Sequence, residues 1–496
     1  MSTAPTEALR ALARLLGAGL AETVAEGGAR QALEGALRER FHARSWQEAE
    51  IRDAYGRSAD ATHVAFAGLL PEGSNPSGPY GGLSLVWFPG AGGRSLLTFV
   101  VGTLGLHPDE ALLGRPGHRR HVAAMRAHLR RAGVAAWTKA DPASIDAPVP
   151  EAVRSAFPGW DDVFRRYGSF VAACAEVGPE DPPRAAATVL AFLDLYAYER
   201  RWQVLAAHRE EAGAYLAGLD AEVFRSPSPA EITALLLERR FVVLQGPPGT
   251  GKTRAADGIR QGETFGGRGL AVQFHPAVTY EDFVVGLAPE PAAEGLRFRV
   301  RAGWLLQAVE AAERTPDQPH LLQIDEINRG DLAKVLGEAI YLFEPREIGG
   351  AAGREVVLPH PWRGRAGLRF PANLYVLATM NTADRSIAGM DLAVRRRFAF
   401  VTLQPDRAPV LAQGLPLATE VFERLTRVFV EHVADDAFPL LPGQAYYLAG
   451  GEPELRRRLR YELLPLLDEY LAGGLLGGAA GELQAQRDWI ADRVAG

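Results

Sequence analysis

The feature that most constrains this fold is a glycine-rich turn between an apolar segment and a helical stretch. The segment Phe-Val-Val-Leu-Gln at 241–245 has the pattern of a buried strand, and Gly-Pro-Pro-Gly-Thr-Gly-Lys-Thr follows at once. Glycines at this spacing let successive backbone N–H groups surround a phosphate at the positive end of the next helix. The residues expected in or beside this phosphate loop are Gly246, Pro247, Pro248, Gly249, Thr250, Gly251, Lys252, Thr253 and Arg254.

The lysine of this loop is informative because lysine is nearly absent elsewhere. The 496 residues include 54 basic side chains, of which only Lys139, Lys252 and Lys334 are lysines. We attribute the excess of arginine to coding bias in a GC-rich genome. Phosphate chemistry favours a lysine at position 252, whose ammonium is expected to reach the β/γ oxygens, while the Thr253 hydroxyl binds Mg²⁺.

Two adjacent carboxylates and an asparagine follow further apolar segments. Asp325 and Glu326 follow the run 321–324, and Asn381 comes shortly after 374–379. Hydrolysis needs a carboxylate that holds the metal and a second that orients the attacking water. We therefore expect Asp325 to hold Mg²⁺ through water, Glu326 to be the base, and Asn381 to sense the γ-phosphate.

Three consecutive arginines follow an apolar helical stretch, at 395–397. One interpretation is a solvated helix end. In a ring-shaped ATPase, however, an arginine at this point faces the neighbouring subunit's nucleotide and stabilises the transition-state charge in trans. We expect Arg396 to have this catalytic role, with Arg397 as the second candidate.

In this order the motifs resemble those of AAA+ ATPases. Longer strings resemble the McrB branch in particular, the NTPase subunits of modification-dependent restriction systems. The resemblance covers 226–471, about half of the chain, and two strings, Asp-Glu-Ile-Asn-Arg and Met-Asn-Thr-Ala-Asp-Arg-Ser, are specific to this branch. The strings lie at 272–283, 324–330, 380–386, 395–398 and 461–470.

The resemblance implies an α/β fold with an AAA+ P-loop NTPase core. In this core a parallel sheet has helices on both faces, and a helical lid follows it. A separate α+β N-terminal domain is expected before the core, and proline-rich stretches mark the breaks. The expected domains are the N-terminal domain (1–182), a helical linker (183–225), the core (226–407) and the lid (408–496).

The resemblance also implies a homo-oligomer with partners. The family forms rings, usually hexamers, with nucleotide between subunits, and its Asn-Arg pair, here Asn328 and Arg329, lies near the junction. The founding member hydrolyses GTP and works with a nuclease subunit, McrC, while other relatives are expected to use ATP. We expect ATP or GTP with Mg²⁺, a McrC-like nuclease and DNA as partners.

The predicted lid leaves two interpretations open. A run of arginines at 456–460 begins an amphipathic helix, and it is either a solvated face or the source of a second, lid-borne sensor. The segment 443–448 matches the family's usual string only loosely, and 346–365 has the pattern of a variable hairpin insertion.

A basic stretch stands out in the N-terminal third, since no acidic residue occurs between Ala111 and Ala140. Near-helical spacing puts several of its arginines on one face, which could follow DNA phosphates. The alternative is a solvated helix, or a face docked on the acidic core domain. The candidate DNA-binding residues are Arg115, Arg119, Arg120, Arg126, Arg130 and Arg131.

Elsewhere in the N-terminal third, the spacing of apolar residues predicts helices at 8–20 and 28–40 and strands at 83–88 and 96–101. Three histidines in the basic stretch have poor spacing for a metal site. Aromatic side chains could line a base-binding pocket or simply belong to the core. These residues are His118, His121, His128, Tyr80, Trp87, Trp137 and Trp160.

Composition excludes several classes. The sequence contains no run of about 18–20 apolar residues, the length that a membrane-spanning helix needs. One cysteine, Cys174, excludes an internal disulfide and a Cys-rich zinc site. With no secretory signal pattern, we expect a cytoplasmic protein. The net charge of −6 means that nucleic-acid contact would need a local patch.

A second interpretation shares the same core. A MoxR-type remodelling chaperone would use the phosphate loop and the acidic pair without any role on DNA. The branch-specific strings favour the restriction interpretation, and the presence of both Lys252 and Glu326 argues against an inactive ring.

Overall fold

The computed structural model divides into two compact units, which are described separately. Unit 1 comprises 1–224, 427–435 and 476–482, and unit 2 comprises 225–426, 436–475 and 483–496. The structure describes residues 28–47, 49–53, 64, 66–71, 83–101, 103–104, 107–108, 116–139, 149–291, 296–348, 353–383 and 392–495.

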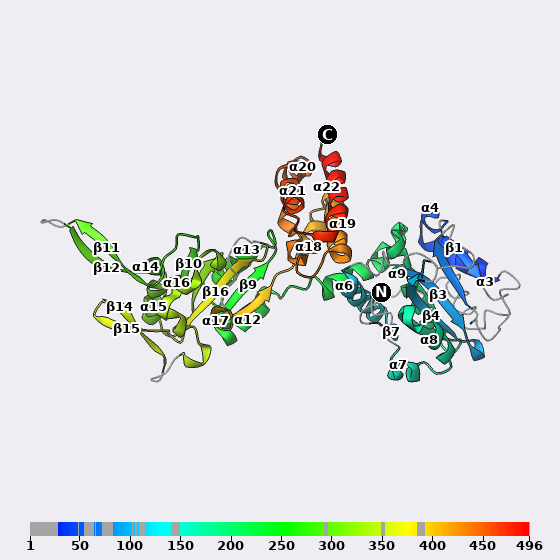
Figure 1. Cartoon of the computed structure of the whole chain (residues 1–496), viewed down its shortest axis with the longest axis horizontal. Coiled ribbons are helices and arrows are strands. Elements are labelled where there is room, and N and C mark those ends of the chain that lie inside the picture. Colours follow the sequence, from blue (N-terminus) through cyan, green and yellow to red (C-terminus); the bar gives the residue numbers. More distant parts are fainter. Residues whose placement is uncertain are drawn as a thin grey trace. The chain divides into compact units, whose positions relative to one another are not determined.

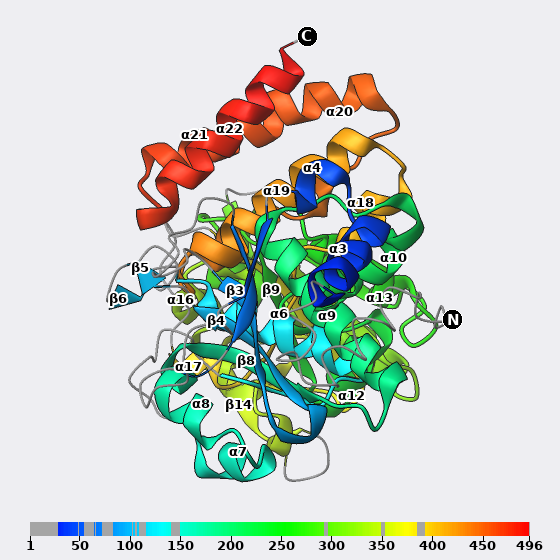
Figure 2. The same ribbon diagram turned by 90° about the vertical axis from the view of Figure 1, so that its right-hand side faces the viewer.

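Unit 1 is built on an antiparallel sheet of six strands in the order β1-β2-β3-β4-β8-β7 (Figures 1 and 2). The predicted strands at 83–88 and 96–101 are confirmed as β3 and β4, which a short 3₁₀ turn connects. Six consecutive residues of β3 are buried, so both faces of the sheet are covered. The strands are β1 (Ala49–Asp53), β2 (Ala67–Pro71), β3 (Leu83–Pro89), β4 (Ser95–Val101), β7 (Ala136–Thr138) and β8 (Val171–Val177).

Helix α9 is the central helix of unit 1. It begins with prolines, Asp181 accepts a hydrogen bond from the Arg184 N–H at its start, and the helix contacts β3, β4 and β8. Residues 183–224 of the expected linker (183–225) are therefore grouped with unit 1 by their contacts. The helices are α3 (Gly28–Arg40), α4 (Ala43–Trp46), α6 (His118–Arg131), α7 (Glu151–Ala156), α8 (Asp161–Tyr167), α9 (Pro182–Arg200), α10 (Arg209–Ala212) and α11 (Ala214–Glu222).

A buried ion pair ties α3 to α9. The Arg40 guanidinium donates two hydrogen bonds to the Asp194 carboxylate, at 2.6 and 2.8 Å. Both side chains are almost fully buried, so removing one partner would leave an uncompensated charge inside unit 1. The bidentate geometry thus fixes α3 against α9.

Unit 2 contains a parallel sheet of five strands in the order β10-β13-β16-β9-β17 (Figure 1). Its strands alternate between two separate cores. Phe241 and Val243 of β9 face one core with α15, while Val242 and Leu244 face the other with α12 and α13. Helices on both faces are what a parallel sheet requires. The elements are β9 (Phe241–Gly246), β10 (Gly269–Gln273), β13 (His320–Asp325), β16 (Leu374–Asn381), β17 (Ala399–Thr402), α12 (Pro229–Arg239), α13 (Lys252–Gln261), α15 (Trp304–Arg314) and α16 (Leu332–Leu336).

Two hairpins and a helical region complete unit 2. One hairpin pairs β11 (Val285–Pro291) with β12 (Leu296–Ala302), and the other pairs β14 (Glu355–Trp362) with β15 (Arg365–Arg369), near the predicted insertion. The helical C-terminal region confirms the expected fold class. Its helices are α18 (Arg407–Ala412), α19 (Pro416–His432), α20 (Glu452–Arg458), α21 (Leu464–Ala472) and α22 (Ala480–Val494). The last part of α19, from 427, and the first residues of α22, 480–482, are grouped with unit 1.

Several sequence predictions fall outside the described residues: the helix at 8–20, Tyr80, Arg115 and the end of the string at 380–386. The helix predicted at 28–40 is confirmed as α3. Within the part of the chain that the structure describes, no helix is both long and apolar enough to span a bilayer.

Candidate nucleotide site

The phosphate loop connects β9 to α13, as its sequence predicts. Gly249 and Gly251 have φ values of 79° and 82°, a region that favours glycine. A Cβ on Gly246 would lie 2.2 Å from the Leu403 carbonyl oxygen, so no larger residue fits there. The helix begins at Lys252, and its free N–H groups lie at the loop.

The Lys252 side chain is hydrogen-bonded to the phosphate loop. Its ammonium donates to the carbonyls of Gly246, at 2.9 Å, and Pro247, at 2.6 Å. Burial lowers the pKa of Lys252 to about 8, and the nearby carboxylates of Asp325 and Glu326 oppose that shift. An anionic phosphate beside Lys252 would favour its charged form.

A threonine that the sequence analysis missed connects the acidic pair to the sheet. Thr379, on β16, donates to Asp325 Oδ1 and accepts a hydrogen bond of 3.1 Å from the Glu326 N–H. The Thr253 hydroxyl donates to the same Asp325 oxygen at 2.9 Å. Hydroxyl and carboxylate oxygens suit Mg²⁺, so Thr253 and Asp325 fit the expected metal site, where Mg²⁺ would neutralise phosphate charge.

Glu326 lies in a strained position at the end of β13. Its φ and ψ are 54° and 46°, which is uncommon for a residue with a side chain. Its carboxylate forms an ion pair of 2.8 Å with Arg329 and accepts a 3.4 Å hydrogen bond from Gln273. The expected base is therefore oriented by two side chains at the edge of the sheet.

Asn381 lies on the next strand, at the same edge. Parallel pairing puts Asn381 in register with Gly246, the first residue of the phosphate loop. Its side-chain oxygen accepts from the Ala383 N–H at 3.1 Å, and its backbone carbonyl accepts from Asn328 at 3.4 Å. The structure thus brings Asn381 to the edge of the sheet where the phosphate loop begins.

The three arginines at 395–397 have different environments. Arg395 stacks over Phe400, with 4.5 Å between the guanidinium carbon and the ring centroid. Arg397 is only 7 % exposed, whereas Arg396 is exposed and forms no ion pair with the described residues. Arg396 and Arg397 are the two candidates for acting on a neighbouring subunit's nucleotide. Of these two, Arg396 is the one that is exposed at the surface.

Residues 443–446, part of the loosely matching segment 443–448, contact the phosphate loop, which the sequence did not indicate. The Gly443 N–H donates to the Pro248 carbonyl at 2.8 Å, and the Ala445 N–H donates to the Gly249 carbonyl at 3.0 Å. A Cβ on Gly443 would lie 2.3 Å from the backbone of Gly249, so glycine is needed for this approach.

The basic stretch of unit 1 forms helix α6, and its arginines divide into two groups. Arg120 points into unit 1, where it donates to the carbonyls of Phe429 and Val433 at the end of α19 and to Asp435. A cation at this point satisfies carbonyls that the helix end leaves without partners. The exposed group comprises Arg119, Arg126, Arg130 and Arg131.

Two of the exposed arginines and two of the histidines have partners within unit 1. Arg126 donates to the Thr138 hydroxyl at 3.0 Å, and Arg130 lies 3.9 Å from Glu222. His121 is 2.6 Å from Glu199, and His128 contacts the Ala191 carbonyl at 3.0 Å. These histidines therefore have structural roles in the packing of α6.

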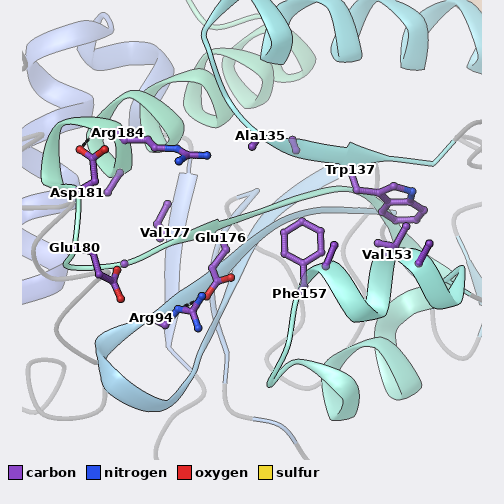
Figure 3. A pocket seen from close by; sticks show the side chains of 15 residues that line it. Arg94, Ala135, Trp137, Val153, Phe157, Glu176, Val177, Glu180, Asp181 and Arg184 are labelled. Carbon is purple, nitrogen blue, oxygen red and sulfur yellow. Dashed lines mark hydrogen bonds and ion pairs between the residues drawn. The ribbon is translucent and has the colours of Figure 1, made fainter.

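Unit 1 also contains a cavity of about 660 Å³ beside the end of β8 and the start of α9 (Figure 3). Half-buried Trp137 and Phe157 line one part of it, and an ion pair of Arg94 with Glu176 lines another. Burial raises the pKa of Glu176, while Arg94 and a hydrogen bond from Trp160 oppose the rise. The cavity combines surfaces for ring stacking with polar groups, as ligand pockets do.

Comparison with known proteins identifies the domain that carries the phosphate loop. Residues 241–398 match the AAA domain of the dynein-related subfamily. The chain is also 38 % identical, over 170 residues, to the EcoKMcrB subunit of a type IV methyl-directed restriction enzyme from Escherichia coli K12. That match covers 34 % of this chain and 36 % of the relative.

A second relative also belongs to a restriction system. The YdiS component of the type II restriction enzyme BsuMI from Bacillus subtilis 168 is 25 % identical over 33 % of this chain and 57 % of its own length. The chain thus spans about a third of the length of the first relative and somewhat over half of the length of the second. These matches therefore establish that the phosphate loop belongs to an AAA-type domain.

Replacing Thr379 tests the link between the acidic pair and the sheet. In Thr379→Val, Asp325 and the Glu326 N–H lose their shared hydroxyl. We expect nucleotide hydrolysis to fall by about 10²-fold, since misplaced catalytic groups have effects of this size, while nucleotide affinity changes less than about threefold. Thr233→Val, which removes a hydroxyl that donates within α12 to the Pro229 carbonyl, is the control. If Thr379→Val hydrolyses nucleotide as fast as the control variant does, the proposed role of Thr379 is contradicted.

Proposed function

We propose that this chain, which carries a McrB-like AAA+ ATPase domain, hydrolyses ATP or GTP as the motor subunit of a restriction complex. One observation carries this proposal: Lys252, Thr253, Asp325, Glu326 and Asn381 converge at the carboxyl edge of one parallel sheet. Their chemistry matches what phosphoryl transfer to water requires.

In the proposed mechanism each residue has a separate task. The phosphate-loop amides and Lys252 bind and orient the triphosphate. Glu326, oriented by Arg329, accepts a proton from the attacking water, and Asn381 aligns that water with the γ-phosphate. The relatives named above, both parts of restriction enzymes, support this role for the motor.

Two substitutions separate binding from hydrolysis. Glu326→Gln removes the base but keeps the phosphate cradle and the metal ligands, so nucleotide should bind normally and hydrolysis should fall at least 10²-fold. Lys252→Ala should lose binding itself. Fluorescent-nucleotide titration and phosphate release measure the two effects. Hydrolysis by Glu326→Gln at the unaltered rate would overturn the assignment of the base.

We further propose a ring in which Arg396 completes a neighbour's site. Mixing Arg396→Ala subunits with Lys252→Ala subunits should restore part of the activity, because some junctions then combine two intact halves. Arg395→Ala is the matched control for the change of charge. A mixture as inactive as its components, with assembly intact, would exclude Arg396 from this role.

We also propose that the exposed arginines of α6 bind DNA and that the complex includes a McrC-like nuclease. Replacing Arg119, Arg126 and Arg130 together in the full chain should flatten the salt dependence of duplex binding. Each phosphate contact adds a slope of about −0.9 in log K against log salt, so the expected change is about two to three units. Anisotropy across a salt series measures it, and an unchanged slope would remove these residues from the proposal.

A further inference from the structure

The segment 443–446, here called the clamp, binds the outer side of the phosphate loop. Besides the two backbone hydrogen bonds from Gly443 and Ala445, the Gln444 side chain donates to the Thr250 carbonyl at 3.0 Å. Three consecutive carbonyls of the loop, from 248 to 250, therefore have their partners in the clamp.

The direction of these carbonyls determines the direction of the phosphate-binding amides. In a trans peptide the C=O and the N–H of the next residue point to opposite sides. The carbonyls of Pro248, Gly249 and Thr250 face the clamp, so the N–H groups at 249–251 face away from it. Those N–H groups are the ones that a phosphate would meet in a loop of this type.

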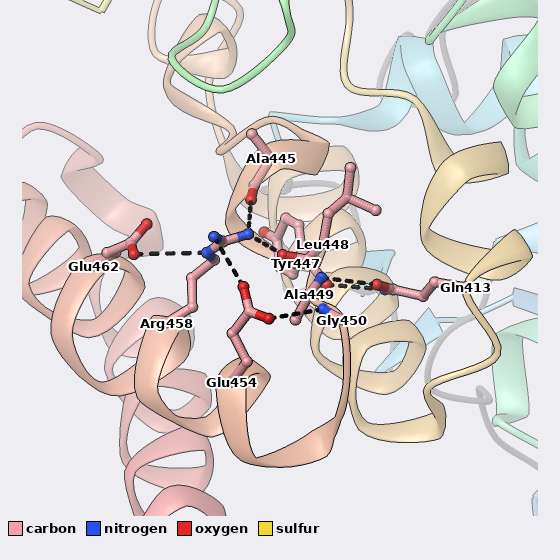
Figure 4. A network of polar contacts seen from close by, with 9 residues as sticks. All are labelled: Gln413, Ala445, Tyr447, Leu448, Ala449, Gly450, Glu454, Arg458 and Glu462. Carbon is pink, nitrogen blue, oxygen red and sulfur yellow. Dashed lines mark hydrogen bonds and ion pairs between the residues drawn. The ribbon is translucent and has the colours of Figure 1, made fainter.

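A network in the helical region holds the clamp in place (Figure 4). Arg458 donates to the carbonyls of Leu448 and Ala445 and forms ion pairs with Glu454, at 3.4 Å, and Glu462, at 3.6 Å. Gln413 binds both sides of the same turn, donating to the Tyr447 carbonyl at 2.9 Å and accepting from the Ala449 N–H at 3.0 Å.

Gln444 connects the clamp to a third element. While its amide nitrogen donates to the loop, its oxygen accepts a hydrogen bond of 3.1 Å from the Asp406 N–H, at the start of α18. The ring of Tyr446 packs against Gly249 from the same side. One side chain thus joins the phosphate loop to the beginning of the helical region.

We infer that Gln444 and Arg458 are positioning residues for nucleotide binding: Gln444 orients the phosphate-loop amides through the opposite carbonyls, and Arg458 holds the segment that carries Gln444. This inference rests on the proposed nucleotide site. In this role Arg458 acts on the nucleotide through the clamp and the phosphate loop. A lid-borne sensor would instead touch the phosphate itself. Nucleotide affinity then depends on the helical region even though neither side chain reaches the ligand.

The test uses the full chain with fluorescent mant-ATP and mant-GTP in the presence of Mg²⁺. Gln444→Met keeps the side chain's volume and removes both of its hydrogen bonds, so affinity should fall about tenfold. KM should rise by a similar factor while kcat changes less than about twofold. Gln484→Met, the same change on the exposed face of α22, is the control and should bind as the unaltered chain does.

Arg458 is tested through coupling. Arg458→Met should weaken binding by a similar factor, and Arg458→Lys, which keeps a donor for the Leu448 carbonyl, should recover part of the loss. Because both residues act through one segment, the double variant should lose much less than the product of the single effects. If Arg458→Met fails to fold, Arg458→Lys combined with Gln444→Met carries this test.

The outcomes separate the inference from the proposed function. Unaltered affinity in Gln444→Met, or fully multiplicative losses in the double variant, would overturn the inference while the nucleotide site stands. If the unaltered chain binds neither nucleotide, the proposed function fails and the inference with it.

Discussion

Parallel pairing of β9, β13 and β16 is the constraint on which the site depends. In a parallel sheet all carboxyl ends meet at one edge, so residues far apart in the chain arrive together there. Gly246 is in register with Asn381, and Ile324, just before the acidic pair, is in register with Ala378. Two separate apolar cores fix this register, since a slip by one residue would exchange the faces of each strand.

The chemistry of the edge is built from polar groups that bind one another. Thr379 holds Asp325 and the Glu326 backbone, and Arg329 holds the Glu326 carboxylate. The clamp adds a layer on the far side of the phosphate loop. The amides at 249–251 and the carboxylates of Asp325 and Glu326 are thus held by partners on their far side, which reduces the reorganisation needed on binding.

Unit 1 depends on interactions of a different kind. Arg120 satisfies backbone carbonyls at the end of α19, and Gly117 lies so close to Val430 that a Cβ would be 1.8 Å from its carbonyl oxygen. The face of α6 that contains Arg120 is therefore structural, and only the exposed arginines of the same helix remain candidates for DNA. Arg120 itself is thus no longer a candidate for DNA contact.

Much of unit 2 could be predicted because its signals are local. The phosphate loop is defined by glycines whose φ values only glycine adopts readily, and the acidic pair ends an apolar strand. Thr379 and Gln444 could not be found in this way, because their roles depend on partners on β13 and in the phosphate loop that are remote in the sequence. The same holds for 183–224, whose helical pattern reveals a helix but not the sheet against which α9 packs.

Hydrogen–deuterium exchange on the full chain, with and without MgATP or MgGTP, tests the central claim most directly. If the nucleotide binds in the phosphate loop and the clamp fixes that loop, saturating nucleotide should slow exchange both at 249–251 and at 443–446. Unchanged exchange at both segments with either nucleotide would contradict the account.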